Sequence, residues 1–364
     1  MVETNIGLTR YLTDMAKRRY SKKGNKIQPA VMTLSFQLTS APFQVNTTDY
    51  IDLSQVASVV NRRFYRQGIN WAVGGFKVLT TSGYKGQIMI SKLPNTWVMS
   101  NAWEKGFRAY MRMNKEALEE NESVRPRFLD FKVYADAQHA QKGVAANLLP
   151  YTFDPTVPAF NVAVPGEWEM SKIVVPFGPA SPGNTTDFEL IATGASFPGA
   201  GASGADSVSL IEGYAASRGL PEIQDPNTPD DASDADGSTP ENWLTALFNK
   251  GTDQDSEVLG DLITENNQAP YPFENAVVGG VTITDTQYPG GANQLPGMQT
   301  HSLELVSTTT VGGTTRFKGG NFPCGLVAIN QFQEADGGPF TALLEIDLVP
   351  GNHRGYLCEP MTEM

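Results

Sequence analysis

Short segments rich in β-branched and aromatic residues, each bounded by Gly, Pro, Asn or Asp, follow one another along most of this chain. Segments of this kind are typical of β-strands. In the segment 30–39, the apolar residues Met32, Leu34, Phe36 and Leu38 alternate with polar ones, which predicts a strand that buries one face. Ten further segments have the same character: 69–80, 86–91, 127–137, 167–177, 187–194, 206–214, 275–285, 301–311, 323–332 and 340–350.

These segments succeed one another without regularly alternating helices, which favours an all-β antiparallel sandwich or jelly roll over a doubly wound α/β fold. The 35 Gly and 24 Pro fit a chain with many turns, and 364 residues can bury a sizeable core. We expect a basic N-terminal arm at 1–29, one jelly-roll domain at 30–350 and a C-terminal tail at 351–364. Within the domain, the acidic composition at about 221–272 predicts a loop insertion at the surface.

A first helix is predicted from Asp52 to Gly68. Asp52 and Gln55 have the spacing of a capping box, and Gly68 is a typical left-handed helix terminator. The last turns of this helix would carry three arginines interleaved with Phe64 and Tyr65. Cations at this place either complement the helix dipole or contact phosphate.

A second helix is predicted to begin at Asn101, which forms another capping-box pair with Glu104. Trp103, Phe107 and Tyr110 recur at helical spacing, and we expect them to pack into the core. The opposite face carries four basic residues, which either are solvated or bind an anion: Lys105, Arg108, Arg112 and Lys115.

Charge is distributed very unevenly along the chain. Residues 1–142 hold 21 Lys and Arg against 11 Asp and Glu, a net charge of +10, whereas residues 143–364 hold 6 against 28, a net charge of −22. Such asymmetry suggests one surface that faces a polyanion and another that faces solvent, unless the charges cluster by chance. We expect the acidic run 225–236 to lie on the outside, because carboxylates and phosphates repel each other within the ~8 Å Debye length.

Several motifs are incomplete. The run 199–204, GAGASG, matches GxGxxG but lacks the strand–turn–helix context, so we expect a loop. An EF-hand alignment on Gly237 places Ala232 and Trp243 at ligand positions, and only a loose surface cation site in the acidic loop stays open. The cysteines and histidines form no recognisable metal or catalytic motif. We therefore expect no enzyme activity, no cofactor and no metal.

No run of 18 apolar residues exists, and residues 1–10 lack the apolar stretch of a secretory signal, so we expect a soluble protein made in the cytosol without a membrane partner.

Three stretches together resemble a known family: DLSQVASVVNRRFYRQG (52–68), TWVMSNAWEKGFRAYMRMNKEALEENESVRPRFLDFKVYAD (96–136) and LLEIDLVPGNHRGY (343–356). They are similar to the capsid proteins of small circular Rep-encoding single-stranded DNA (CRESS-DNA) viruses. The resemblance implies a single viral jelly roll that self-assembles into an icosahedral shell of sixty copies or a multiple of that number. It also implies a virion location, with assembly inside the host cell and the nucleus as one candidate compartment.

The resemblance further implies that a basic N-terminal segment faces the packaged single-stranded DNA. The predicted nucleic-acid-binding residues are Lys17, Arg18, Arg19, Lys22, Lys23, Lys26, Arg62, Arg63 and Arg66. Their aromatic neighbours Tyr20, Phe64 and Tyr65 are predicted to stack on unpaired bases. The arm departs from many relatives, because residues 1–30 hold only seven Lys and Arg against two acids.

Two other functions fit a β-rich chain. A secreted or surface carbohydrate-binding β-sandwich would need an exposed aromatic platform, and a β-sandwich glycoside hydrolase would need two carboxylates facing each other across a cleft. Neither arrangement can be read from the sequence.

Overall fold

A computed structural model describes residues 29–39, 46–80, 84–119, 123, 129–154, 159–176, 184–197, 199–218, 244, 248, 277–278, 281–282, 297–307, 313–333 and 341–364. The six basic arm residues predicted to bind nucleic acid, Lys17 to Lys26, lie outside the described residues. So do Tyr20, the acidic run 225–236 and nearly all of the predicted insertion at 221–272.

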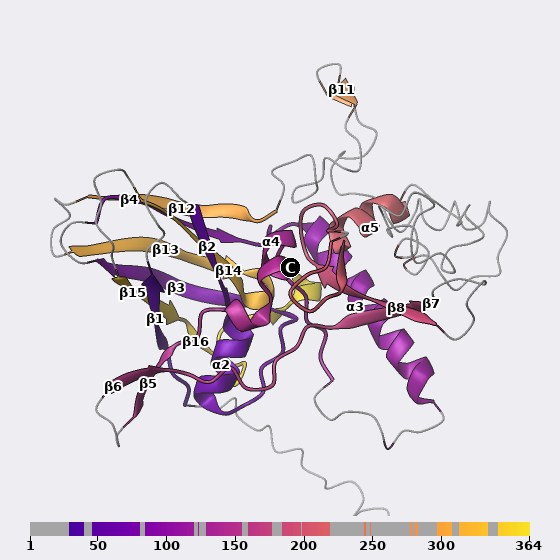
Figure 1. Cartoon of the computed structure of the whole chain (residues 1–364), viewed down its shortest axis with the longest axis horizontal. Coiled ribbons are helices and arrows are strands. Elements are labelled where there is room, and N and C mark those ends of the chain that lie inside the picture. Colours follow the sequence, from indigo (N-terminus) through magenta and orange to yellow (C-terminus); the bar gives the residue numbers. More distant parts are fainter. Residues whose placement is uncertain are drawn as a thin grey trace, which may run out of the picture.

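Two antiparallel sheets form a sandwich-like arrangement, which confirms the expectation of a mainly β, antiparallel protein (Figure 1). Sheet A has the order β1 (Thr33–Thr39), β15 (Thr341–Leu348), β3 (Ile69–Thr80), β13 (Thr314–Phe322), and the short strand β18 (Cys358–Pro360) also pairs with β3. Sheet B has the order β12 (Gln299–Val306), β4 (Gly86–Lys92), β14 (Leu326–Gln333), β2 (Asn46–Asp52).

The core between the sheets follows from the alternation in the strands. Leu34, Phe36 and Leu38 of β1 are at most 1% exposed and belong to one apolar cluster with Trp71 of β3 and Ile90 of β4. Strand β1 thus places every second side chain between the sheets, where burial of apolar area stabilises the fold.

A long insertion separates β4 from β12 and builds a second core. Its elements are α3 (Trp97–Leu118), α4 (Ala137–Lys142), η2 (Val144–Ala146), β5 (Tyr151–Asp154), β6 (Ala159–Val162), β7 (Lys172–Pro176), β8 (Thr185–Ile191), β9 (Asp206–Ser209), α5 (Leu210–Arg218), β10 (Val277–Val278) and β11 (Val281–Thr282). Trp103 and Phe131 lie in its apolar cluster together with Leu326 and Ala328 of β14. Because Val327 and Ile329 face the other core, the insertion packs on the outward side of sheet B.

Helix α3 confirms the expected burial only in part. Trp103 and Tyr110 are buried, whereas Phe107 is partly buried and packs against the same cluster. The helix begins at Trp97 and not at Asn101, because the Thr96 hydroxyl and carbonyl accept from the amides of its first turn.

Other local predictions were wrong in instructive ways. Within the described part of the segment 127–137, residues 129–137, the one β-bridge joins Tyr134 to Ile191, and the second half of 206–214 is helix α5. Strands β2 and β13 escaped prediction, because β2 is largely polar and β13 holds two glycines and two cations among few apolar residues.

The last residues fold onto the domain. The turn between β16 (Pro350–Gly351) and β17 (Gly355–Tyr356) precedes β18 and the short helix η6 (Met361–Glu363). Met361 is fully buried, and its carbonyl accepts from the Ser100 hydroxyl at 2.6 Å. A further short helix, η5 (Pro323–Gly325), leads into β14. Among the described helices, none has both the length and the apolar character required to cross a membrane.

Candidate nucleic-acid interface

The three arginines of the first predicted helix lie in a loop that follows it. Helix α2 (Leu53–Asn61) begins at Asp52, whose carboxylate accepts from the amides of Ser54 and Gln55, as predicted. The helix ends at Arg62, which adopts the left-handed conformation with φ 53°, and not at Gly68. Residues 62–68, called the basic loop below, therefore connect α2 to β3.

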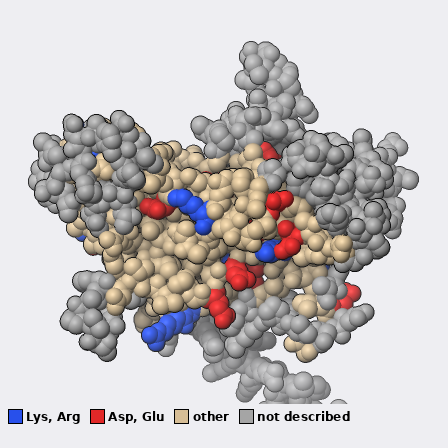
Figure 2. All heavy atoms as spheres, viewed as in Figure 1, with Lys and Arg blue, Asp and Glu red and all other residues tan. Residues whose placement is uncertain are grey.

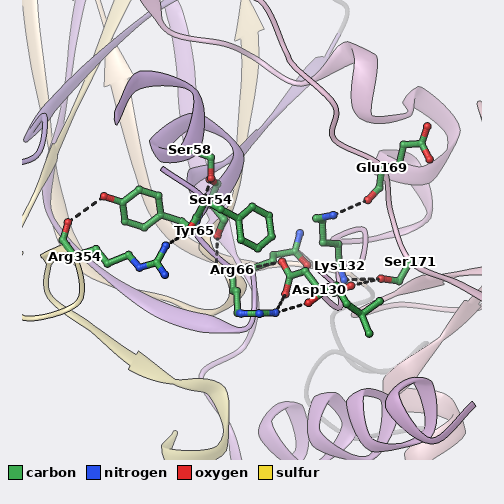
Figure 3. A network of polar contacts seen from close by, with 12 residues as sticks. Ser54, Ser58, Tyr65, Arg66, Asp130, Lys132, Glu169, Ser171 and Arg354 are labelled. Atoms are coloured by element: carbon green, nitrogen blue, oxygen red, sulfur yellow. Dashed lines mark hydrogen bonds and ion pairs between the residues drawn. The ribbon is translucent and has the colours of Figure 1, made fainter. Parts of the chain in front are cut away.

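Hydroxyl groups of α2 hold the basic loop in place (Figure 3). The Ser58 hydroxyl accepts from the Tyr65 amide at 2.9 Å, and the Ser54 hydroxyl donates to the Arg66 carbonyl at 3.2 Å. The Tyr65 hydroxyl donates to the Arg354 carbonyl at 3.0 Å, which connects the loop to the β16–β17 turn. The basic residues thus stand on a backbone with fixed geometry.

Gln67 joins this loop to the insertion. Its side-chain amide donates to Asp52 at 3.0 Å and to the Val133 carbonyl at 3.1 Å, while its side-chain oxygen accepts from the Val133 amide at 2.7 Å. The Gln67 backbone amide donates to Asp130 at 3.2 Å, and the Trp168 indole donates to Asp52 at 3.2 Å. A buried polar group needs such partners, so this network fixes how the insertion meets the sandwich.

Burial dominates the electrostatics of the two carboxylates beneath the loop. Asp52 is fully buried, and desolvation raises its pKa to about 6 despite its hydrogen bonds to Gln67, to Trp168 and to two amides. Burial also raises the pKa of Asp130, although Gln67 and nearby cations act in the opposite direction.

Backbone carbonyls orient the arginines of the loop. The Arg63 guanidinium donates to the Pro29 carbonyl at 3.1 Å, and the Arg66 guanidinium donates to the Leu129 carbonyl. Arg66 also lies 3.6 Å from Asp130, but its side chain stays 54% exposed. Carbonyls are neutral, so they orient a guanidinium without cancelling its charge.

Two further cations lie near the basic loop: Arg354 contacts it directly, and Lys132 acts on the same Asp130 carboxylate as Arg66. The Arg354 guanidinium donates to the Phe64 carbonyl, and the Lys132 ammonium donates to the Glu169 carbonyl at 3.2 Å (Figure 3). Lys132 also lies 4.7 Å from the centre of the Trp168 ring, a cation–π distance. Neither residue was among the predicted nucleic-acid-binding residues. Arg354 lies in the family-like stretch 343–356, but no local signal marked Lys132.

The aromatic predictions separate into two outcomes. Phe64 is half-buried, with the Arg66 guanidinium 5.8 Å from its ring centre. Tyr65 is fully buried, with ring centres 5.9 Å from Trp71 and 5.5 Å from Tyr356. The prediction that Tyr65 stacks on bases was therefore wrong, because its ring packs inside the protein.

The basic face of α3 is organised differently. Arg108 forms an ion pair with Glu104 one turn away, and Lys105 lies 5.4 Å from the centre of the Tyr214 ring. These groups are exposed or half-buried and do not converge with the basic loop in one network.

Figure 2 shows charged residues on one face of the molecule. A group of basic atoms lies at the lower end of α2, and acidic groups predominate on the right, where Figure 1 shows the insertion.

In comparison with known proteins, the chain matches no family model, no curated protein and no solved structure at a significant level.

Proposed function

We propose that this chain is a viral capsid protein, without catalytic activity, that self-assembles into an icosahedral shell and packages single-stranded DNA. The observation that carries the proposal is the pairing of the eight main strands. In chain order, the first pairs with the eighth (β1 with β15), the second with the seventh (β2 with β14), the third with the sixth (β3 with β13) and the fourth with the fifth (β4 with β12). This order is the one expected of a jelly roll, which is one long antiparallel ribbon folded over into two sheets and is an architecture common among viral capsid domains.

The site of DNA contact follows from where the chain enters the sandwich. The first described residue is Pro29, whose carbonyl accepts from Arg63 of the basic loop. Lys26 precedes Pro29 by three residues, so covalent geometry keeps their Cα atoms within ~11 Å. Because the arm joins the described chain beside the basic loop, we assign this side of the subunit to the inside of the shell.

The chemistry of this cluster suits a phosphate backbone. Arginines donate planar, paired N–H groups to phosphate oxygens, and their binding releases counterions without reading any base. Arg62, Arg66 and Arg354 are exposed, whereas Arg63 and Lys132 are half-buried. A half-buried Phe64 beside Arg66 adds an aromatic edge for an unpaired base.

Assembly into a closed shell requires several distinct contacts on each subunit. Such contacts are heterologous, and each should bury more than about 1,000 Å² of surface to be specific. The long insertion and the arm provide surfaces beyond those of the sandwich itself.

The direct test is to purify the full-length chain and examine it by negative-stain electron microscopy and nuclease protection. Uniform closed shells that protect single-stranded DNA would support the proposal, whereas a monodisperse monomer that binds no DNA would refute it. Binding of that monomer to a polysaccharide would favour the carbohydrate-binding alternative.

A set of variants then tests the basic loop. Arg62, Arg63 and Arg66 are replaced together by Gln, and the matched control replaces Arg108, Arg112 and Lys115 of α3 by Gln. We expect the loop variant to form shells with less DNA, while the control keeps its DNA content. Equal DNA content in both variants would remove the basic loop from the packaging surface.

A further inference from the structure

We propose that the outward face of sheet A carries a second phosphate-binding strip, formed by Arg316 and Lys318 of β13 together with Lys77 of β3. The inference rests on the proposed function for its ligand, single-stranded DNA. It adds a contact surface that lies on another element than the basic loop.

The strand register brings these cations together. Arg316 lies directly opposite Lys77, and Lys318 lies opposite Gly75, in the antiparallel pair of β13 and β3. Arg316 and Lys318 are both exposed, while Phe317 between them is buried in the core. Residues two apart on a strand share a face, so the two side chains stand side by side on the outward surface.

Within the described part of the chain, Lys77 is the only member of the strip with a carboxylate partner. Lys77 lies opposite Glu345 on its other side and forms an ion pair with it at 2.8 Å. Among the described residues, no carboxylate lies within ion-pair distance of Arg316 or Lys318. Like charges directly opposite each other on neighbouring strands repel, so an anion bound between Lys77 and Arg316 would relieve an existing cost.

Both β15 carboxylates beside the strip have partners, and the partner of Glu345 is Lys77 of the strip itself. Asp347 is in the same cross-strand row as Lys318, with Gly75 between them, and its carboxylate accepts from the Thr33 hydroxyl at 2.6 Å. Arg316 and Lys318 thus stand on β13, the edge strand of sheet A, with β3 between them and the β15 carboxylates Glu345 and Asp347.

The position of the strip favours DNA over an acidic neighbouring subunit. Thr33 is the first residue of β1 and follows the arm closely in the sequence. Directly opposite one another on successive strands lie Thr33, Asp347, Gly75 and Lys318, so this row crosses the sheet from β1 to β13. Three strand spacings amount to ~14 Å, so the strip and the root of the arm share one face. A DNA strand drawn to the arm therefore reaches Arg316 and Lys318 without leaving that face.

The experiment compares full-length wild type with R316Q/K318Q and with the control R108Q/K115Q. Binding of a fluorescein-labelled oligothymidylate to unassembled subunits is followed by anisotropy at several salt concentrations. For single strands the log–log salt slope changes by about 0.7 per phosphate contact, so R316Q/K318Q should lower its magnitude by about 1.4 and the control should leave it unchanged. Thermal unfolding without DNA should be unchanged or shifted upward, because repulsion with Lys77 is removed.

Three results would overturn the inference. One is an unchanged salt slope in R316Q/K318Q while the wild type binds DNA and forms filled shells, and this result leaves the proposed function intact. Another is an unchanged slope with loss of shells, which would assign the strip to contact with a neighbouring subunit. The third is a lower melting temperature with reduced binding, which would assign the two residues a structural role. A wild type that neither binds DNA nor assembles would instead refute the proposed function itself.

Discussion

Replacing Gly68 with Ala should destabilise the protein through one specific contact. Gly68 ends the basic loop, and a Cβ atom at this position would lie 2.3 Å from Cζ2 and 2.7 Å from Cη2 of Trp103. The Trp103 side chain has little room to retreat, because it is 5% exposed, stacks on Phe107 with ring centres 5.1 Å apart and meets Phe131 edge-on at 5.8 Å. Overpacking of this kind typically costs ~1–3 kcal/mol.

A double-mutant cycle isolates this contact. The substitution Trp103→Phe removes Cζ2 and Cη2, so Gly68→Ala should cost less in the Trp103→Phe background than in the wild type. The expected coupling is between about 0.5 and 3 kcal/mol, measured from urea unfolding of the unassembled full-length chain. Additive effects, or a Gly68→Ala variant with an unchanged unfolding midpoint, would refute the steric reasoning.

Two buried titratable groups should give stability opposite dependences on pH, and the arm should affect packaging. The pKa of Asp52 is raised to about 6, so its protonation favours the folded state. From pH 7 to pH 5, the free energy of unfolding of the wild type should therefore rise by about 1 kcal/mol relative to that of Asp52→Asn, as measured by urea unfolding. A difference between the two proteins that does not change with pH would contradict this. Burial lowers the pKa of His139 to about 4, so protonation of this residue favours the unfolded state. Its contribution should lower the free energy of unfolding by about 2 kcal/mol from pH 7 to pH 5. The substitution His139→Gln should abolish this loss in the same assay. Deleting residues 1–26 should leave the unfolding midpoint unchanged but reduce the DNA retained in shells, as measured by nuclease protection; DNA-filled particles identical to wild type would argue against a role for the arm.

The described parts of the chain show which features local sequence can predict. Alternation in β1 correctly assigned the buried face, because side chains on a strand alternate between faces whatever the partner strand is. The Asp52 cap was also predictable, since its carboxylate bonds to amides only two and three residues away.

Helix ends depended on more distant contacts. By residue type Gly68 predicts a helix end, yet the helix stops earlier at Arg62, where the Arg62 amide bonds back to the Ser58 carbonyl. Position 68 requires glycine for a different reason: the Trp103 ring fills the space that a side chain at this position would occupy. Trp103 belongs to a different helix, so no window around Gly68 contains this information.

The sequence by itself determined a β-rich antiparallel chain, the inward face of β1 and the clustering of three arginines at 62–66, which it placed in the last turns of a helix. Only the tertiary structure decided that β1 pairs with β15, that Arg354 bonds to the loop that carries these arginines, and that Tyr65 is buried. Periodicity and capping depend on residues that are close together in the sequence, so a short segment is enough to predict them. The choice of partners hundreds of residues apart depends on which closed arrangement buries the most apolar surface while satisfying the polar groups beneath it.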